Sequence, residues 1–453
     1  MLNEQKANQI LGTAFGPLTI KDIHWRSQDS DKSSILFYKI AEDEKSRSLF
    51  TERIAEANFG CLVVNVEIDS LPKNAVVIPE AKWPEVQKQI LDELYPLPAI
   101  KLIAITGTNG KTTTTDLILQ LAGILGLPGL SIGTLGVRDT KQTILDFGLT
   151  SPSLIDLRKF LNIYGADKMF CVMEASSHAL AQHRFYGLEF DCAGWLSFSQ
   201  DHLDYHQTME AYFEVKTSIF KQLKKNAKLF VPEEQKELRE KLTSVSDKTH
   251  SAHPISGKLP LFFHTRFNRN NLEVAVAILQ DVFKVKAPTN LDAIKPTDGR
   301  FYIRPFKTNY IVVDFAHTPD ALENICRGIH DAFPNHKLKV LFGCGGDRDR
   351  SKRPKMAAVV ENWADKIYVT SDNPRSEEPM AIIKDIIQGI KKKTYEIIVE
   401  RPMAVKLALS ELTEHEVLLL AGKGHEDYIL IKGVKYPYSD AKEVEQFLSR
   451  MNS

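Results

Sequence analysis

A lysine and a threonine that directly follow two glycines are the residues of this chain best suited to binding phosphate. Gly107 and Gly110 let the backbone turn back with its N–H groups pointing inward, and Lys111 and Thr112 come next. In such an arrangement the loop amides cradle phosphates, the lysine reaches the β and γ oxygens, and the threonine hydroxyl can bind Mg²⁺. The full pattern has a further glycine where this chain has Ile105, so a simple tight turn is the alternative interpretation.

The segments on either side of these residues are the ones that a phosphate loop requires. The apolar residues Ile103–Ile105 predict the end of a buried strand, and the apolar spacing from Leu117 to Leu125 predicts a helix. A strand, a glycine loop and a helix in this order favour nucleotide binding. The residues predicted to contact the nucleotide here are Gly107, Thr108, Asn109, Gly110, Lys111, Thr112 and Thr113.

Two further predicted strands end in side chains that could bind a metal ion. The apolar run Met169–Met173 ends at Glu174, and the run Cys192–Ser197 leads into a polar cluster that contains His202. A carboxylate at a strand end can bind Mg²⁺, whereas the histidine is as often structural as functional. Lys216 follows in a helical pattern and, on composition alone, would be an ordinary surface lysine.

The last part of the chain contains three apolar runs that each lead into a polar loop. Lys339–Phe342 leads into 343–350, Ile367–Thr370 into 371–375, and Val417–Leu420 into 421–426. Helical patterns lie between them, so we expect a second parallel sheet with charged loops along one edge. The segment 236–253 is polar and is interpreted as exposed helix and loop.

Length and pattern together predict an α/β protein of three domains. A chain of 453 residues is long enough for about three domains, and Pro-rich 95–98 is a plausible linker. We expect domains at 1–98, 99–285 and 286–453. The central one should be a parallel sheet with flanking helices around the phosphate loop.

The overall composition excludes several classes of function. The 58 basic and 58 acidic residues cancel, which argues against bulk binding to nucleic acid or to an anionic membrane. No apolar run approaches the length of a membrane span, and the first residues do not have the pattern of a signal peptide. The five cysteines have no metal-binding spacing, so we expect a reduced, cytoplasmic protein. Cys344, in a glycine loop, is interpreted as a small residue in a turn.

Motifs spread over residues 100 to 430 resemble those of the Mur ligases, ATP-dependent amide ligases that build the peptidoglycan stem peptide. One such motif would be weak evidence, but the whole series occurs here in the order of the family. The matching stretches are Thr106–Thr113, Leu149–Pro152, Glu174–Leu180 with Gln182 and Arg184, Asp201–His206, Val313–Asp320, Gly343–Asp349, Asp372–Arg375 and Gly422–Glu426.

The resemblance implies roles that the pattern alone does not give. Lys111, Glu174, His202 and Lys216 correspond to catalytic positions of the family. Lys216 matches a lysine that CO₂ carbamylates, and Mg²⁺ would be bound by Thr112, Glu174, His202 and the modified Lys216. Further nucleotide contacts would be Asn271, Arg300 and Asp314. Contacts to the UDP-linked substrate would be Ser27, Thr150, Ser151, Ser176, Gln182 and Arg184. Contacts to the added amino acid would be Arg348, Asp372, Asn373, Pro374, Arg375, Gly422 and Glu426.

The resemblance also implies an activity and the fold that serves it. The first domain would hold the UDP-substrate, the second ATP, and the third, a Rossmann-like domain, the amino acid. The chain is most similar to the branch that adds meso-diaminopimelate to UDP-N-acetylmuramoyl-L-alanyl-D-glutamate, using ATP and Mg²⁺, and would act as a monomer. The alternatives are a related ligase such as a folylpolyglutamate-synthase-like enzyme, or a nucleotide-binding homologue without turnover.

Overall fold

The computed structural model describes residues 1–12, 19–41, 43–69, 71–255, 259–288 and 290–451. The chain divides into two compact units. The first unit comprises Met1–Thr106, Leu125–Ala193 and Val215–Lys228, and the second comprises Gly107–Ile124, Gly194–Glu214 and Leu229–Ser453. Helices alternate with strands throughout, which confirms the predicted α/β class. Domain boundaries at residues 98 and 285 stay a prediction.

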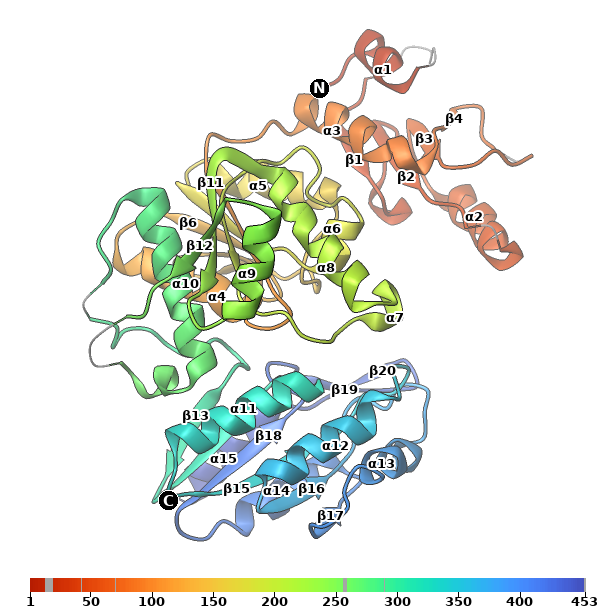
Figure 1. Cartoon of the computed structure of the whole chain (residues 1–453). Helices are drawn as coiled ribbons and strands as arrows, with labels where there is room; N and C mark the ends of the chain where they lie inside the picture. Colours follow the sequence, from red (N-terminus) through yellow and green to blue (C-terminus); the bar gives the residue numbers. More distant parts are fainter. Residues whose placement is uncertain (13–18, 42, 70, 256–258, 289, 452–453) are drawn as a thin grey trace. The chain divides into compact units, whose positions relative to one another are not determined.

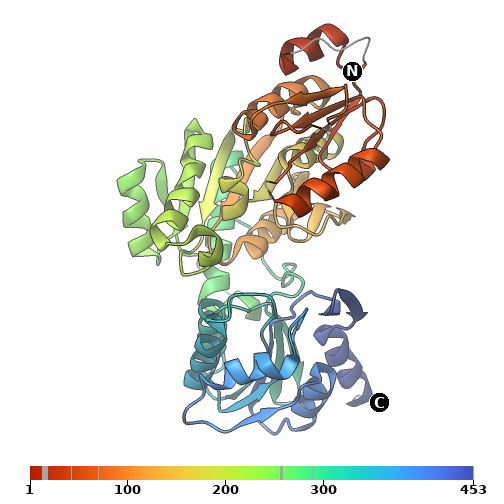
Figure 2. The same ribbon diagram turned by 90° about the vertical axis from the view of Figure 1, so that its right-hand side faces the viewer.

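A small parallel sheet begins the first unit. Its strands lie in the order β1-β2-β3-β4. They are β1 (Asp22–His24), β2 (Ser34–Tyr38), β3 (Cys61–Val64) and β4 (Ala75–Val77). Alternate residues of β2 and β3 point to opposite faces, because side chains alternate along a strand. One face packs on α1 (Glu4–Leu11) and α3 (Trp83–Leu94), and the other on α2 (Glu44–Glu56). Figure 2 shows this sheet between its helices.

The largest sheet contains eight strands in the order β12-β11-β10-β5-β9-β6-β7-β8. Their bounds are β5 (Lys101–Thr106), β6 (Gly129–Gly133), β7 (Gly136–Asp139), β8 (Thr143–Leu145), β9 (Phe170–Glu174), β10 (Phe190–Trp195), β11 (Leu223–Pro232) and β12 (Thr249–Ala252). The helices of this part of the chain are α4 (Lys111–Ile124), α5 (Leu154–Gly165), α6 (Ser177–Ala181), α7 (Leu203–His206), α8 (Met209–Thr217), α9 (Lys236–Val245) and α10 (Arg266–Phe283). The strands predicted at 103–105, 169–173 and 192–197 are confirmed as β5, β9 and β10, with ends shifted by a few residues.

The interpretation of 236–253 as helix and loop was only partly right. The helix is confirmed as α9, but Thr249–Ala252 forms strand β12, which pairs in parallel with β11. Its side chains are mostly polar and only Ala252 is buried. A four-residue strand at the edge of a sheet needs no apolar alternation, so no pattern in the sequence predicted it.

The C-terminal sheet lies in the second unit and contains six strands in the order β13-β14-β18-β15-β16-β17. They are β13 (Tyr302–Phe306), β14 (Asn309–Asp314), β15 (Lys337–Phe342), β16 (Lys366–Val369), β17 (Tyr395–Ile397) and β18 (Glu416–Ala421). Only the β13–β14 pair is antiparallel. A hairpin of β19 (Tyr428–Ile431) and β20 (Val434–Pro437) follows.

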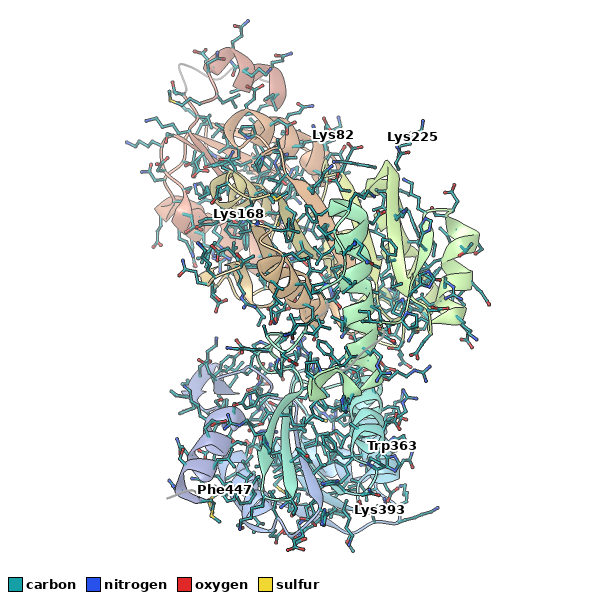
Figure 3. All side chains as sticks on the ribbon, turned by 90° about the vertical axis from the view of Figure 1, so that its left-hand side faces the viewer. Lys82, Lys168, Lys225, Trp363, Lys393 and Phe447 are labelled. Carbon is teal, nitrogen blue, oxygen red and sulfur yellow. The ribbon has the colours of Figure 1, made fainter. Side chains whose placement is uncertain are left out.

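Helices cover both faces of this six-stranded sheet (Figure 1). One face carries α11 (Pro319–Ala332), α12 (Lys352–Trp363) and α13 (Pro379–Ile387), and the other carries α14 (Arg401–Ser410) and α15 (Asp440–Met451). Figure 3 labels Trp363 of α12 and Phe447 of α15 on opposite sides of the sheet. Because β15, β16 and β18 are adjacent and parallel, the loops at 343–350, 371–378 and 421–426 leave the same edge.

Short 3₁₀ helices complete the described structure, at η1 (Ser27–Asp29), η2 (Glu80–Lys82), η3 (Ser218–Gln222) and η4 (Leu261–His264). None of the described helices combines the length and the apolar character that crossing a membrane requires.

Candidate active site

The predicted phosphate loop joins β5 to α4. Gly107 and Gly110 have positive φ angles of 143° and 89°. The backbone N–H of Thr108 donates to the Ser197 carbonyl at 2.9 Å, and that of Asn109 donates to the Ser197 hydroxyl at 3.0 Å. Lys111 Nζ folds back and donates to the carbonyls of Gly107 and Thr108 at 2.9 and 3.0 Å. The strand, loop and helix context predicted from the sequence is therefore confirmed.

Asn271 lies directly against this loop. It is a buried residue of α10, and a Cβ placed on Gly110 would lie 2.5 Å from its Oδ1 atom and 2.8 Å from Leu196 Cδ1. Only a glycine fits at position 110, because of this contact and because its φ angle disfavours an L side chain. The structure thus brings the predicted nucleotide contact Asn271 to the predicted phosphate loop.

Glu174 ends β9 as expected, and its carboxylate is held by a residue that sequence analysis did not identify. The backbone N–H of Thr134 donates to Glu174 Oε1 at 2.7 Å, and the Thr134 hydroxyl lies 3.3 Å from Oε2. Gly133 leaves room for this contact, since a Cβ there would lie 2.3 Å from Oε1. The glycine that ends the apolar strand β6 was the available signal for Thr134.

Five of the six residues predicted to contact the UDP-linked substrate, all but Ser27, form one polar network in the first unit. Ser151 Oγ donates to the Glu174 carbonyl at 2.7 Å and lies 3.0 Å from Ser176 Oγ, which also caps α6. Arg184 donates to the Ser151 carbonyl and, at 2.7 Å, to Gln182 Oε1. The hydroxyl of Thr150 accepts from that of Thr134 at 3.2 Å. The network therefore joins Thr150, Ser151, Ser176, Gln182 and Arg184 to Glu174 and Thr134.

Ser27 lies in η1, where its carbonyl accepts the Ser30 hydroxyl at 2.7 Å. Trp25, two residues earlier, donates its indole N–H to Asp156 Oδ2 at 2.7 Å. Asp156 belongs to the first turn of α5, just after the segment 150–153. Sequence analysis had given no role to Trp25, which joins this part of the chain to the start of α5.

Lys216 is buried rather than a surface lysine of α8. Its exposed fraction is 1%, and Nζ donates to the Thr106 hydroxyl at 3.3 Å. The Thr106 hydroxyl in turn donates to the carbonyl of Ala175, the residue after Glu174. The lysine thus reaches the carboxyl ends of β5 and β9, which a helical pattern in the sequence could not reveal.

His202 does not end a strand, contrary to the prediction. β10 ends at Trp195, and His202 precedes α7 with a positive φ of 54°. Its Nε2 atom lies 3.4 Å from Asp201 Oδ2. Burial by itself raises the pKa of Asp201, but the charge of His202 is the largest of the interactions that outweigh it and lower the pKa to about 2.

The predicted Mg²⁺ ligands offer the right kind of donor. In the described part of the chain, no group of three or more His, Cys, Asp or Glu residues is arranged to hold a metal ion. The Thr112 hydroxyl and the Glu174 carboxylate are both buried, and oxygen atoms are the ligands that Mg²⁺ prefers. Thr112 and Glu174 therefore each fit Mg²⁺ chemically.

Arg300 and Asp314, the other predicted nucleotide contacts, lie close together. The Asp314 carboxylate accepts the backbone N–H groups of Phe301 and Ala316, both at 2.7 Å. The Arg300 guanidinium stacks over the Phe315 ring, 4.5 Å from its centre. Burial raises the pKa of Asp314, against the opposing effect of Arg300.

A buried lysine joins the residues predicted to contact the added amino acid. Lys423 Nζ lies 3.0 Å from Asp372 Oδ1, 2.8 Å from Asn373 Oδ1 and 3.0 Å from Glu426 Oε2. Burial raises the pKa of Asp372, but Lys423 and then Arg401 outweigh it and lower the pKa. Sequence analysis included Lys423 in a motif without assigning it a role.

Gly422 packs against this cluster around Lys423, because a Cβ there would lie 2.8 Å from Asp372 Oδ2.

Arg375 and Arg348 come from the loops after β16 and β15. Arg375 has a positive φ of 53°, and its Nη1 atom donates to the Gly346 carbonyl at 2.8 Å. A Cβ on Gly345 would lie 2.7 Å from that Nη1 and 3.7 Å from Arg348 Cγ. Helix α13 begins only at Pro379, so Arg375 lies in the loop before it and not at a helix start.

Two more predicted residues are accounted for by packing. The Pro374 carbonyl faces Gly346, where a Cβ would lie 2.0 Å from it. Cys344 is buried with its Sγ 3.6 Å from Met356 Sδ, and burial raises the pKa of this thiol to about 12. Cys344 is thus a buried packing residue of the loop after β15, and its interpretation as a residue of a tight turn stays a prediction.

Comparison with known proteins places this site in a family. The model of the Mur ligase middle domain matches residues 105–278, and that of the Mur ligase glutamate ligase domain matches residues 299–424.

Curated relatives match over most of the chain. Two of these relatives are named UDP-N-acetylmuramoyl-L-alanyl-D-glutamate--2,6-diaminopimelate ligase. The protein from Aquifex aeolicus is 35% identical and covers 92% of this chain and 91% of its own. The protein from Listeria monocytogenes is 32% identical, with 92% of both chains covered.

A solved structure of a ligase with the same name covers 98% of this chain and 99% of its own, with 26% identity and a TM-score of 0.63. A folylpolyglutamate synthase from Thermotoga maritima, at 16% identity and a TM-score of 0.53, covers 75% of this chain and 90% of its own and shows a shared fold. The chain belongs to the Mur ligase family.

Proposed function

We propose that this chain is a cytoplasmic, monomeric ligase that uses ATP to join meso-diaminopimelate to UDP-N-acetylmuramoyl-L-alanyl-D-glutamate. The observation that carries the proposal is the buried cluster in which Asp372, Asn373 and Glu426 surround Lys423, with the half-buried Arg375 nearby in the chain. Relatives with this named activity cover more than nine-tenths of the chain, which supports the same substrates here.

The first chemical step would activate the D-glutamate carboxylate. A carboxylate oxygen attacks the γ-phosphorus of ATP, the bond to the β-phosphate oxygen breaks, and an acyl phosphate and ADP result. Such a transfer depends on positioning and on neutralising the charge of the transferred group. Lys111 would supply the positive charge, and backbone N–H groups at the start of α4 would supply hydrogen-bond donors.

Glu174 and Lys216 would help to bind the Mg²⁺ that this step requires. When bound, Mg²⁺ neutralises phosphate charge and orients the transferred group. Thr112, Glu174, His202 and a carbamylated Lys216 are the residues that would hold it. Carbamylation forms a bond between Nζ and the carbon of CO₂ and releases two protons from the lysine ammonium group, so a buried cation becomes an anion that can bind metal.

The second step would form the amide bond. The amine of the added amino acid attacks the acyl carbon, a tetrahedral intermediate forms, and phosphate leaves as the amine loses a proton. Phosphate leaves far more easily than oxide, which is why the activation is needed. Gly422 and Glu426 would contact the far stereocentre. Arg375, flanked by Asp372 and Asn373, would bind the far carboxylate with Arg348 as a second contact, since guanidinium groups pair with carboxylates bidentately.

Two alternatives remain distinguishable from this proposal. A folylpolyglutamate-synthase-like ligase would share the fold, but the segment Asp372–Arg375, one of the stretches that resemble the diaminopimelate-adding branch, speaks against it. A homologue without turnover would have no need of Lys111, Glu174 and Lys216 together. Both alternatives make different predictions in one assay.

That assay measures phosphate release from ATP with the UDP-linked dipeptide and a panel of amino acids, each omitted in turn. The proposal predicts release that requires both the dipeptide and meso-diaminopimelate. Release with a folate and glutamate instead would favour the first alternative, and no amine-dependent release under any condition would favour the second.

A further inference from the structure

Two loops of the C-terminal sheet, 343–350 and 371–378, are bonded directly to each other; we call them the loop pair. The Gly346 N–H donates to the Asn373 carbonyl at 2.9 Å. The Ser376 hydroxyl and backbone N–H donate to the Asp347 carboxylate at 2.5 and 3.2 Å. Arg348 belongs to the first loop and Arg375 to the second. These bonds therefore hold together the two loops from which the guanidinium groups extend.

One buried arginine is bonded to both loops. Arg353, in the first turn of α12, is 1% exposed. Its Nη2 and Nη1 atoms donate to the two carboxylate oxygens of Glu377 at 2.7 and 3.0 Å, a bidentate pair. Nη2 also lies 3.3 Å from the Gly345 carbonyl, and Nη1 donates to Asp385 of α13 at 2.8 Å. A single planar group thus connects two helices with the loop pair.

Glu377 is also hydrogen-bonded to the loop that carries Arg348. Its Oε1 atom accepts the backbone N–H of Asp347 at 2.7 Å, in addition to the bond from Arg353. The Arg353 hydrogen bond is the largest influence on the pKa of Glu377, which falls to about 2. The carboxylate is therefore ionised at neutral pH, as both of its bonds require.

We propose that Arg353 and Glu377 are positioning residues that set the separation of Arg348 and Arg375, and so determine how tightly the amino-acid substrate is held. The inference rests on the proposed function, in which those two guanidinium groups bind the far carboxylate. Neither Arg353 nor Glu377 touches the reacting atoms. A carboxylate shared by two guanidinium groups tolerates little displacement, and a misplacement of about 1 Å can cost about 10²-fold in rate.

The first test compares Glu377→Gln with Arg350→Ala. The glutamine keeps the shape of the side chain but loses the charge that Arg353 requires. Arg350, the last residue of the first loop, is an exposed arginine that also pairs with Asp385, at 3.0 and 3.2 Å, so its loss removes an ion pair next to Arg353 and keeps the hydrogen bonds of Glu377 to Arg353 and Asp347. It is therefore the matched control.

Glu377→Gln should raise the KM for meso-diaminopimelate by about 10- to 100-fold. Its kcat at saturation, and its KM values for ATP and the UDP-linked dipeptide, should stay within a few fold of wild type. Arg350→Ala should change none of these values by more than about twofold, as is usual for an exposed ion pair. A general loss of stability would instead lower kcat, so this division of effects separates positioning from a merely structural role.

The second test does not depend on activity. Hydrogen exchange of the backbone should become faster in 343–350 and 371–378 for Glu377→Gln and stay unchanged there for Arg350→Ala. Arg353→Lys keeps a charge but cannot form the bidentate pair, and should give an intermediate effect in both tests. It also serves if Glu377→Gln does not fold.

Unchanged exchange in the loop pair together with an unchanged KM for meso-diaminopimelate would overturn the inference. If the wild type does not use meso-diaminopimelate at all, the proposed function fails. Exchange in the loop pair then decides by itself whether Arg353 and Glu377 order these loops.

Discussion

Lys111 is the side chain whose loss should cost the most activity. Lys111→Ala removes the positive charge beside the β and γ phosphates, and losing one such preorganised group typically costs about 10²–10³-fold in kcat. The fold should remain intact, because the hydrogen bonds from Nζ to the carbonyls of Gly107 and Thr108 lie within this one loop. Phosphate release and thermal unfolding check this, with Lys141→Ala, an exposed lysine, as control. A folded mutant with near-normal turnover would refute the role.

Lys216 is expected to be carbamylated in the active enzyme. Lys216→Ala should lose activity, and a small carboxylate such as formate should partly restore it by replacing the carbamate oxygens. The site is buried, so only small acids should act. A high-resolution map with nucleotide, metal and substrate bound should show the modified side chain. A plain amine in that map would contradict the prediction, whereas mass spectrometry in acid would not, since carbamates decompose there.

At the residue scale, the sequence predicted side chains whose chemistry is visible in a motif and missed those that act by burial. The glycines and Lys111 could be identified by type and spacing, whereas the role of Arg375 was implied only by the resemblance. Lys423 could not be identified, because its role comes from loops that meet only in the folded chain, and the only signal for Thr134 was the glycine before it. The burial of Lys216 could not be predicted either, since a helical pattern does not indicate whether the charged end of a long side chain is buried.

Helix α4 offers a matched pair of glycines, one at each end, for testing the phosphate loop as an element. Gly110→Ala would place a Cβ 2.5 Å from Asn271 Oδ1 at a positive φ, and should weaken ADP binding by at least about 10-fold. Gly126→Ala meets nothing within 4 Å, although its φ is also positive at 69°. It should therefore cost only about 1–2 kcal/mol of stability from backbone strain.

Calorimetry of ADP binding and thermal unfolding of both variants measure the difference. Equal ADP affinity in Gly110→Ala and wild type would show that the loop does not approach the nucleotide as proposed.

Strands were predictable in proportion to their burial. β5, β9, β15 and β18 are apolar almost throughout, and the sequence located each within a few residues. The edge strand β12 and the short strands β7 and β8 carry polar residues, and hydrogen bonding to a neighbouring strand, rather than an apolar pattern, defines them. His202 was misplaced for a related reason: β10 ends at Trp195, before the polar cluster that was taken to mark its end.

At the scale of the whole molecule, residues 1–98 should be needed for stability as well as for substrate binding. The core of the first sheet includes Leu154 and Ile155 of α5, and the buried Arg158 donates to Asp92 and to the Tyr95 carbonyl. Deleting 1–98 would expose these apolar side chains and leave the guanidinium without those partners. The fragment 99–453 should unfold at a clearly lower temperature than the full chain.

Thermal unfolding of the purified fragment and of the full chain checks this. A fragment as stable as the full chain would show that α5 does not depend on the first sheet. Its KM for the UDP-linked dipeptide would then report how much the segment around Trp25 and Ser27 contributes to binding.

The specificity for meso-diaminopimelate over lysine is the central claim, because the two amino acids differ by a single carboxylate at the far end of the side chain. Lysine would leave Arg375 unpaired, and sites built around a polar partner reject analogues that lack it by about 10⁴–10⁵-fold. Arg375→Ala should cost about 2–5 kcal/mol with meso-diaminopimelate, as for truncating one partner of a buried charge pair. The substitution should reduce the difference in kcat/KM between meso-diaminopimelate and lysine without making lysine a good substrate.

The most direct measurement is kcat/KM for meso-diaminopimelate and for lysine, on the wild type and on Arg375→Ala. We predict that the wild type strongly prefers meso-diaminopimelate. In the variant this preference should become smaller only because kcat/KM for meso-diaminopimelate falls. A wild type that uses lysine equally well would contradict the account of the amino-acid site.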